Sequence, residues 1–143
     1  MNVAQCLPLW SAFAELFLDT EVSADTHRYI ARQLLASELS ADILSNILWL
    51  EVFPALCDNL RGSAGEWAGF NEQWLQELIL AVVNRQAAAY SALGLITVSQ
   101  AVEIVEAEWR ACCTYLPAPF FAAQRPSLRS IRRSGKRQLW RWS

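Results

Sequence analysis

The sequence predicts an all-α protein, a single compact orthogonal bundle of five to six helices followed by a basic C-terminal tail. Apolar residues recur at three- to four-residue spacing throughout the chain, and no segment shows the sustained period-2 alternation of a strand. A Ser, Asn or Thr that can cap a helix precedes most of these apolar segments. With 143 residues, the chain is long enough for one domain with a single hydrophobic core.

The first part of the chain contains three predicted helices, each with its own start signal. Pro8 suits the first turn of a helix, so we expect a helix over residues 8–20. Ser23 is a favourable N-cap for a second helix over 24–37. Ser40 can cap the third in the same way.

Pro54 falls inside the apolar pattern of this third helix. Proline has no backbone N–H and its ring clashes with the preceding turn. We therefore expect a kink or a restart there, with a short further helix over 54–60 that ends at Gly62.

Two more helices complete the predicted bundle. Asn71 can cap a long helix over 72–92. Thr97 and Gln100 have the spacing of a capping box, in which each side chain bonds the other's backbone N–H, and they predict a helix over 98–114.

The charge of the chain is divided between its two ends. Residues 1–108 hold all 14 acidic side chains and only four basic ones, a formal charge of −10. Residues 109–143 hold eight basic side chains and no acidic one, a formal charge of +8. Fields of this size affect the choice of partner more than the fold, so we expect the body to attract basic molecules.

A change of composition near residue 117 predicts a boundary. Pro117, Pro119 and Pro126 interrupt any helical pattern, and basic residues follow them. We divide the chain into an acidic helical domain, residues 1–116, and a proline-broken basic aromatic tail, residues 117–143.

The candidate residues for binding a basic partner are carboxylates at helical spacing, together with the acid and aromatics of the glycine-rich loop over 65–70. Such carboxylates also mark the solvated face of an ordinary helix, and we expect one of them, Glu106, to form an i,i+4 ion pair with Arg110. A tryptophan in such a loop either fills the core between helices or presents itself to a partner, and both interpretations stay open. The partner-binding candidates are Glu15, Asp19, Glu66, Trp67, Phe70, Glu103 and Glu106.

The tail interleaves arginine with tryptophan, a combination that suits three targets. These are an anionic membrane surface, nucleic acid, and the protein's own acidic body. A disordered basic tail without a specific role is the plain alternative. The tail-binding candidates are Arg129, Arg132, Arg133, Arg137, Trp140 and Trp142.

No catalytic, cofactor or metal motif occurs in the sequence. His27 is the only histidine, so histidine-rich metal sites are excluded, and we expect His27 on the solvated surface. The four cysteines lack C-x-x-C spacing and are expected to be reduced, buried thiols. We predict no enzymatic activity, no catalytic residue, no metal site and no cofactor. If the protein were an enzyme, its candidate catalytic acids would be Glu15, Asp19 and Glu66.

Three segments resemble a small, functionally uncharacterised family of bacterial helical proteins. They are LWSAFAELFLDTE from Leu9, ILWLEVFPA from Ile47 and AGEWAGF from Ala64. The resemblance covers about residues 7–83. It implies a compact all-α domain in a proteobacterial-type cytoplasm and brings no established activity.

We therefore expect a non-enzymatic binding protein, most concretely an immunity-type protein that neutralises a basic toxin through its acidic helical face. The alternative is a regulator that associates with an anionic membrane or nucleic acid through its Arg/Trp-rich tail. The N-terminus has neither a basic n-region nor a long apolar run, which favours a cytoplasmic protein. No oligomeric state follows from the sequence.

Overall fold

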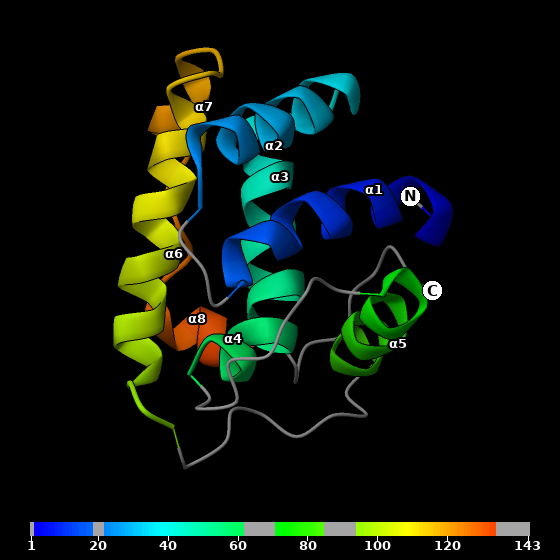
Figure 1. Ribbon diagram of the computed structural model, residues 1–143, viewed down its shortest axis with the longest axis vertical. Helices are drawn as coiled ribbons and strands as arrows, with labels where there is room; N and C mark the ends of the chain where they lie inside the picture. The colour runs from blue at the N-terminus through cyan, green and yellow to red at the C-terminus, as the bar shows by residue number, and fades with distance from the viewer. Residues whose placement is uncertain (1, 19–21, 62–70, 85–93, 134–143) are drawn as a thin grey trace.

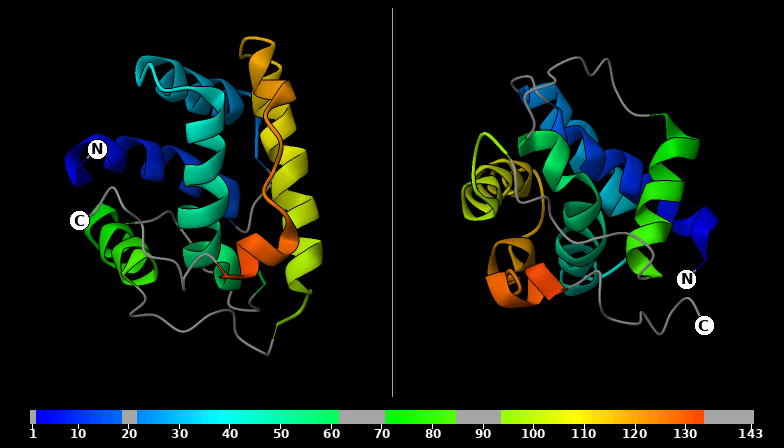
Figure 2. Two further views of the ribbon diagram at one scale, coloured as in Figure 1. Left: turned by 180° about the vertical axis from the view of Figure 1, so that it is seen from behind. Right: turned by 90° about the horizontal axis from the view of Figure 1, so that it is seen from below.

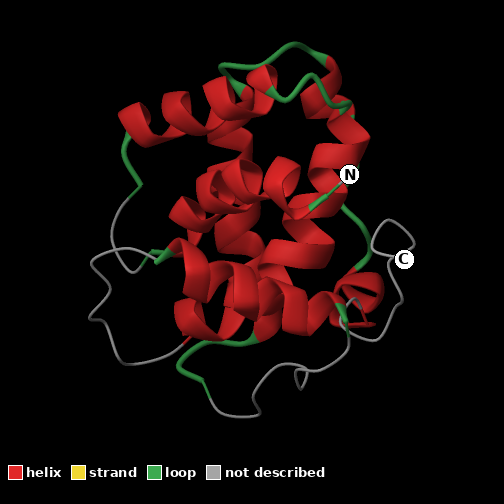
Figure 3. Cartoon of the chain, turned by 90° about the vertical axis from the view of Figure 1, so that its right-hand side faces the viewer, coloured by secondary structure: helices red, strands yellow, loops and turns green. Residues whose placement is uncertain are grey.

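Every regular element among the described residues is a helix (Figure 3). The computed structural model describes residues 2–18, 22–61, 71–84 and 94–133. Along the chain these residues form α1 (Val3–Ala14), the 3₁₀ turn η1 (Glu15–Phe17), α2 (Ala24–Ala36), α3 (Ala41–Ile47), the π-helical turn η2 (Leu48–Val52), α4 (Phe53–Arg61), α5 (Glu72–Val83), α6 (Val98–Cys113), α7 (Pro119–Ala122) and α8 (Leu128–Arg133). With α3, η2 and α4 counted as one helix, five helices reach seven residues or more, which confirms the predicted all-α fold.

The helices lie in two crossing directions (Figure 1). The continuous helix α3–η2–α4 and α6 run along the long axis of the molecule, and α1 and α2 cross them. This is the orthogonal arrangement that the sequence predicts.

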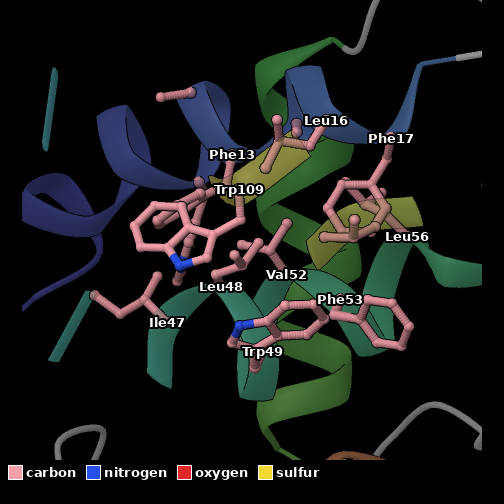
Figure 4. Close-up of a cluster of buried hydrophobic side chains, with 14 of the residues drawn as sticks. Phe13, Leu16, Phe17, Ile47, Leu48, Trp49, Val52, Phe53, Leu56 and Trp109 are labelled. Carbon is pink, nitrogen blue, oxygen red and sulfur yellow. The ribbon is translucent and has the colours of Figure 1, made fainter. Parts of the chain in front are cut away.

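Aromatic side chains from three of these helical segments meet in the core (Figure 4). The ring centroids of Phe13 and Trp109 lie 5.8 Å apart, and those of Phe17 and Phe53 lie 5.9 Å apart. Trp49 lies 5.4 Å from Phe53. Edge-to-face and tilted contacts of this kind add to the free energy that burial of the rings already supplies.

Helix α1 begins five residues earlier than the sequence predicts, and the expected start at Pro8 is wrong. Asn2 and Gln5 form a capping box, each side chain bonding the other's backbone N–H at 2.9 Å. Pro8 then lies inside the helix on an exposed side. The carbonyl that its missing N–H leaves unbonded belongs to Ala4, which is also exposed and open to water.

Helical structure continues through Pro54, where a π-helical turn accommodates the proline. Leu48–Val52 adopts this wider turn immediately before the proline, and α4 follows without a loop. A π-turn shifts the hydrogen-bonding pattern by one residue, which accommodates the N–H that proline lacks. The predicted restart near residue 54 therefore takes the form of a π-turn inside one helix.

Ala41–Arg61 is the one described helix that is long and apolar enough to cross a bilayer, judged by length and composition alone. Of its most apolar stretch, 56% is buried inside the bundle. Glu51, near its middle, is fully buried as well. This burial is the pattern of a core helix.

Helices α2, α3, α5 and α6 begin where the sequence predicts, whereas α7 and α8 lie in the predicted tail, for which no helix was expected. The Asn71 side chain caps α5, and Thr97 with Gln100 forms the expected capping box of α6. Helix α5 is described as far as Val83, and residues 85–92 of the predicted helix lie outside the described residues.

The chain beyond residue 116 contributes to the core. Phe120 of α7 is 7% exposed and Ile131 of α8 is completely buried. Figure 2 shows α7 beside α6 and α8 near α4, and α6–α7 and α4–α8 contacts accompany this placement. These two side chains attach the first part of the predicted tail to the bundle.

Candidate functional site

A groove separates α1 from the C-terminal end of α2. It encloses about 390 Å³, and none of the described residues that line it is charged. Its walls include Ala4, Pro8 and Leu9 from α1, and Gln33, Ala36 and Leu39 from the end of α2 and the turn that follows.

Glu38 lies at the edge of this groove, between the lining residues Ser37 and Leu39. Its φ of 59° is left-handed, in the position after a helix where glycine is usual. The turn is held locally, because the Ser37 hydroxyl donates to the Leu34 carbonyl at 2.6 Å and accepts from the Leu39 N–H at 3.2 Å. A left-handed conformation costs a residue with a Cβ on the order of 1 kcal/mol.

A second exposed carboxylate, Asp42, follows four residues later. It lies in the first turn of α3, where the helix dipole favours an anion, and Ser40 caps the same turn. Among the described residues, neither Glu38 nor Asp42 has a basic partner. The α2–α3 turn and the first turn of α3 therefore carry two exposed carboxylates, close in the chain to the residues that line the groove.

Ion pairs in the described part of the chain engage four arginines but leave several exposed carboxylates without a basic partner. The pairs join Arg28 to Asp25 at 2.9 Å, Arg61 to Asp58 at 2.7 Å, and both Arg110 (3.5 Å) and Arg125 (2.9 Å) to Glu106. The exposed carboxylates without a basic partner among the described residues are Glu38, Asp42, Glu72, Glu77 and Glu103. They are distributed over the α2–α3 turn, α5 and α6.

Three of the seven predicted partner-binding residues, Glu15, Glu103 and Glu106, lie among the described residues. Glu103 is exposed on α6, and Glu106, one turn later, is engaged by arginines, which confirms its predicted pair with Arg110. Glu15 is half-buried in η1. The other candidates, Asp19, Glu66, Trp67 and Phe70, lie outside the described residues.

Partial burial raises the pKa of the Glu15 carboxyl above its ordinary value of 4.5. Ionisation of Glu15 therefore destabilises the fold, and this penalty is absent below pH 4.5 and complete once the pH exceeds the folded-state pKa. We expect Glu15→Gln to raise the free energy of unfolding at pH 7 by less than about 1 kcal/mol, since solvent screens a half-exposed group. Urea unfolding at pH 7 and pH 4 measures this, with exposed Glu103→Gln as the control; a gain independent of pH contradicts it.

His27 is not on the solvated surface, and that prediction is wrong. Its side chain is 12% exposed, and Nε2 lies 2.6 Å from Glu108 Oε2. Helix α2 contacts α6, and His27, in the first turns of α2, meets there an acid 81 positions away.

All four cysteines are buried, as the sequence predicts. Burial raises the pKa of the Cys112 thiol to about 12 and that of Cys113 to about 11. Both thiols are therefore protonated at neutral pH and are poor nucleophiles. No group of three or more His, Cys, Asp or Glu residues in the described ranges is arranged to hold a metal ion.

Only part of the tail candidates can be placed. Arg129 is exposed on α8, and Arg132 and Arg133 end the same helix. Arg137, Trp140 and Trp142 lie outside the described residues.

Sequence reasoning missed the groove, because its walls are small or uncharged residues from two helices that carry no motif. One local signal was present. The 24–37 helix ends without a glycine in the position after it, and the residue found there instead, Glu38, is charged.

Comparison with known proteins identifies a family. No curated protein and no solved structure matches the chain. A model of the family described as Domain of unknown function (DUF7079) matches residues 4–115, a longer stretch than the resemblance over 7–83. The match includes both walls of the groove, Glu38 and all of α6. The chain therefore belongs to this uncharacterised domain family.

Proposed function

We propose that this protein is a non-enzymatic binding protein that holds a basic segment of a protein partner in the α1–α2 groove. The concrete version is an immunity-type protein that neutralises a basic toxin in a bacterial cytoplasm. One observation carries the proposal, namely an uncharged groove with exposed Glu38, in a left-handed backbone conformation, between two of its lining residues in the chain.

The groove and its edge match the two ends of a lysine or arginine side chain. Such side chains lay their apolar stems along apolar surface and keep the charged group in a polar environment. A partner's stem fits between α1 and α2, with its cation near Glu38 and Asp42. Charge complementarity of this kind speeds association and excludes acidic partners.

The backbone of Glu38 supports a role at this position. Glycine adopts the left-handed conformation without penalty, so the presence of Glu38 there costs stability. Strain that persists in a folded protein is concentrated at binding and active sites, where the strained residue has a task.

The test uses two double variants with the same change of charge. Glu38→Gln with Asp42→Asn removes the groove carboxylates, and Glu72→Gln with Glu77→Gln removes two exposed carboxylates of α5. The probe is a short synthetic peptide of alternating arginine and leucine, titrated at low salt and followed by NMR. We expect shifts at residues 36–39, binding about tenfold weaker in the groove variant, and wild-type binding in the α5 variant.

A third variant separates stability from binding. Glu38→Gly relieves the left-handed strain and should raise the free energy of unfolding by up to about 1 kcal/mol, while it weakens binding of the peptide. The proposal is contradicted if the Glu38/Asp42 double variant and Glu38→Gly bind the peptide as tightly as wild type does. It is also contradicted if the α5 variant loses as much affinity for the peptide as the Glu38/Asp42 variant. The immunity-type function is then tested in bacteria that express a basic protein which co-purifies with this chain. Wild-type protein should protect the cells from that protein, and the Glu38/Asp42 variant should not.

A second candidate function rests on α8. Ile131 is completely buried, so α8 is fixed to the bundle, and Arg129 is exposed without an acidic partner among the described residues. We propose, as the alternative, that the basic tail binds an anionic membrane or nucleic acid. Arg129→Gln with Arg137→Gln should then weaken co-sedimentation with anionic vesicles or retardation of duplex DNA, and unchanged binding in both assays rejects it.

A further inference from the structure

A second cavity, which shares no lining residue with the α1–α2 groove, lies between α6, η2 and the segment that carries α7. It encloses about 240 Å³. Its walls include Trp49 from η2, Trp109 and Arg110 from α6, and Phe120 and Arg125 from the α7 segment.

The wall of this cavity holds a buried hydrogen-bond donor with no partner in the part of the chain that the structure describes. Trp49 is completely buried, and its indole N–H has no hydrogen-bond acceptor among the described residues. Buried donors are almost always bonded, and leaving one without a partner costs about 1–3 kcal/mol. An acceptor on a molecule bound beside Trp49 would supply the missing bond.

The charged residues of the lining leave an excess of positive charge. Arg125 Nε donates to Glu106 Oε2 at 2.9 Å, and Arg110 Nη2 lies 3.5 Å from Glu106 Oε1. Two guanidinium groups thus share one carboxylate, and Glu106 is the only acid among the described residues of the lining. The Arg125 guanidinium also lies over the Trp49 ring, 5.9 Å from its centroid. An anionic group at this position would meet two arginines.

Aromatic side chains form part of the remaining wall, together with Cys113, Ala123 and Gln124. The Trp109 and Phe120 rings lie 6.4 Å apart, and Phe121 lines the cavity as well. Aromatic walls favour a planar apolar ligand. The volume is below the roughly 300–1,000 Å³ of pockets for drug-sized molecules, so the ligand is a single ring with a short acidic group.

We propose that this cavity binds a small aromatic carboxylate, whose carboxylate lies on Arg110 and Arg125 and whose ring lies against Trp49 and Trp109. Glu106 holds the two arginines in place and is the group with which the ligand competes. The Cys113 thiol in the wall is protonated at neutral pH and is a poor nucleophile.

The test measures binding of benzoate to the full chain by calorimetry, with benzamide and acetate as matched probes. Benzamide keeps the ring without the charge, and acetate keeps the charge without the ring. We expect saturable benzoate binding in the millimolar range or tighter and much weaker binding of both other probes. The Trp49 indole resonance, assigned with Trp49→Phe, should shift on addition of benzoate.

Variants of the charged residues give effects of opposite sign. Arg110→Gln and Arg125→Gln should each weaken benzoate binding about tenfold, the effect of losing one charge-assisted hydrogen bond. Glu106→Gln should strengthen it severalfold, because it removes the competing carboxylate. Arg32→Gln, which removes an exposed base of α2 outside the cavity lining, should leave binding unchanged.

Four results overturn the proposal. These are the absence of saturable benzoate binding, equal binding of benzamide, a Trp49 resonance that does not move, and Glu106→Gln weakening binding as a purely structural residue would. If Arg125→Gln does not fold, Arg110→Gln decides, since the Arg110 side chain is 63% exposed and its loss leaves the core intact.

Discussion

Replacing Trp10 by phenylalanine is expected to lower the free energy of unfolding by about 3 kcal/mol. Trp10 is completely buried, and its Nε1 donates a 2.9 Å hydrogen bond to Oε1 of Glu51, which is also completely buried. Phenylalanine removes the donor and leaves the buried carboxyl with one partner fewer, which costs about 1–3 kcal/mol. The smaller ring adds the cost of lost apolar contact and of a cavity.

The bundle offers a matched control in Trp49→Phe. Trp49 is as deeply buried as Trp10, yet its indole N–H has no hydrogen-bond partner among the described residues. Its replacement therefore loses ring volume without a hydrogen bond, and it should destabilise less than Trp10→Phe by about 1–2 kcal/mol. Urea unfolding of both variants measures the difference. Equal losses would mean that the Trp10–Glu51 bond contributes nothing to stability.

The sequence predicts helix ends well where the signal is local. The side chains of Ser23, Ser40, Asn71 and Thr97 each accept a hydrogen bond from the first turn of the helix that follows, as expected. A cap involves only residues two or three positions apart, so a short stretch of sequence is enough to predict it. Pro8 misled the prediction of the first helix, because the stronger capping box of Asn2 lies upstream of it.

Features that depend on helix packing could not be predicted from the sequence. His27 and Glu108 meet across 81 positions because α2 packs against α6, and the groove exists because α1 crosses near the end of α2. Arg125 reaches Glu106 and Trp49 only because the chain returns past α6. A single sequence gives the charge and polarity of these residues but not which of them come into contact. It therefore predicts only a general acidic face and a general basic tail.

Truncation after residue 116 should lower the free energy of unfolding by at least about 4 kcal/mol. In a protein of ordinary stability, a loss of this size leaves most of the molecules unfolded. It removes Phe120 and Ile131 from the core and uncovers the Trp109 ring, against which Phe120 packs at 6.4 Å. Deleting a buried isoleucine side chain alone costs about 2–5 kcal/mol, and a buried phenylalanine about 3–5. The predicted boundary at 117 marks a change of composition. If truncation destabilises the protein as expected, the cooperative folding unit extends beyond this boundary, as far as α8.

Point variants test this expectation even if the truncated chain does not fold. Ile131→Ala should lower the free energy of unfolding by about 2–4 kcal/mol, whereas Arg129→Ala, two residues earlier on the exposed side of α8, should change it by less than about 0.5 kcal/mol. A truncated chain of residues 1–116 that melts at the temperature of the full protein would show that residues 1–116 are the independent domain. Loss of stability in Ile131→Ala with none in Arg129→Ala means instead that α8 is anchored by apolar burial, so that the segment between α6 and α8, with its cavity, is a fixed part of the folded bundle.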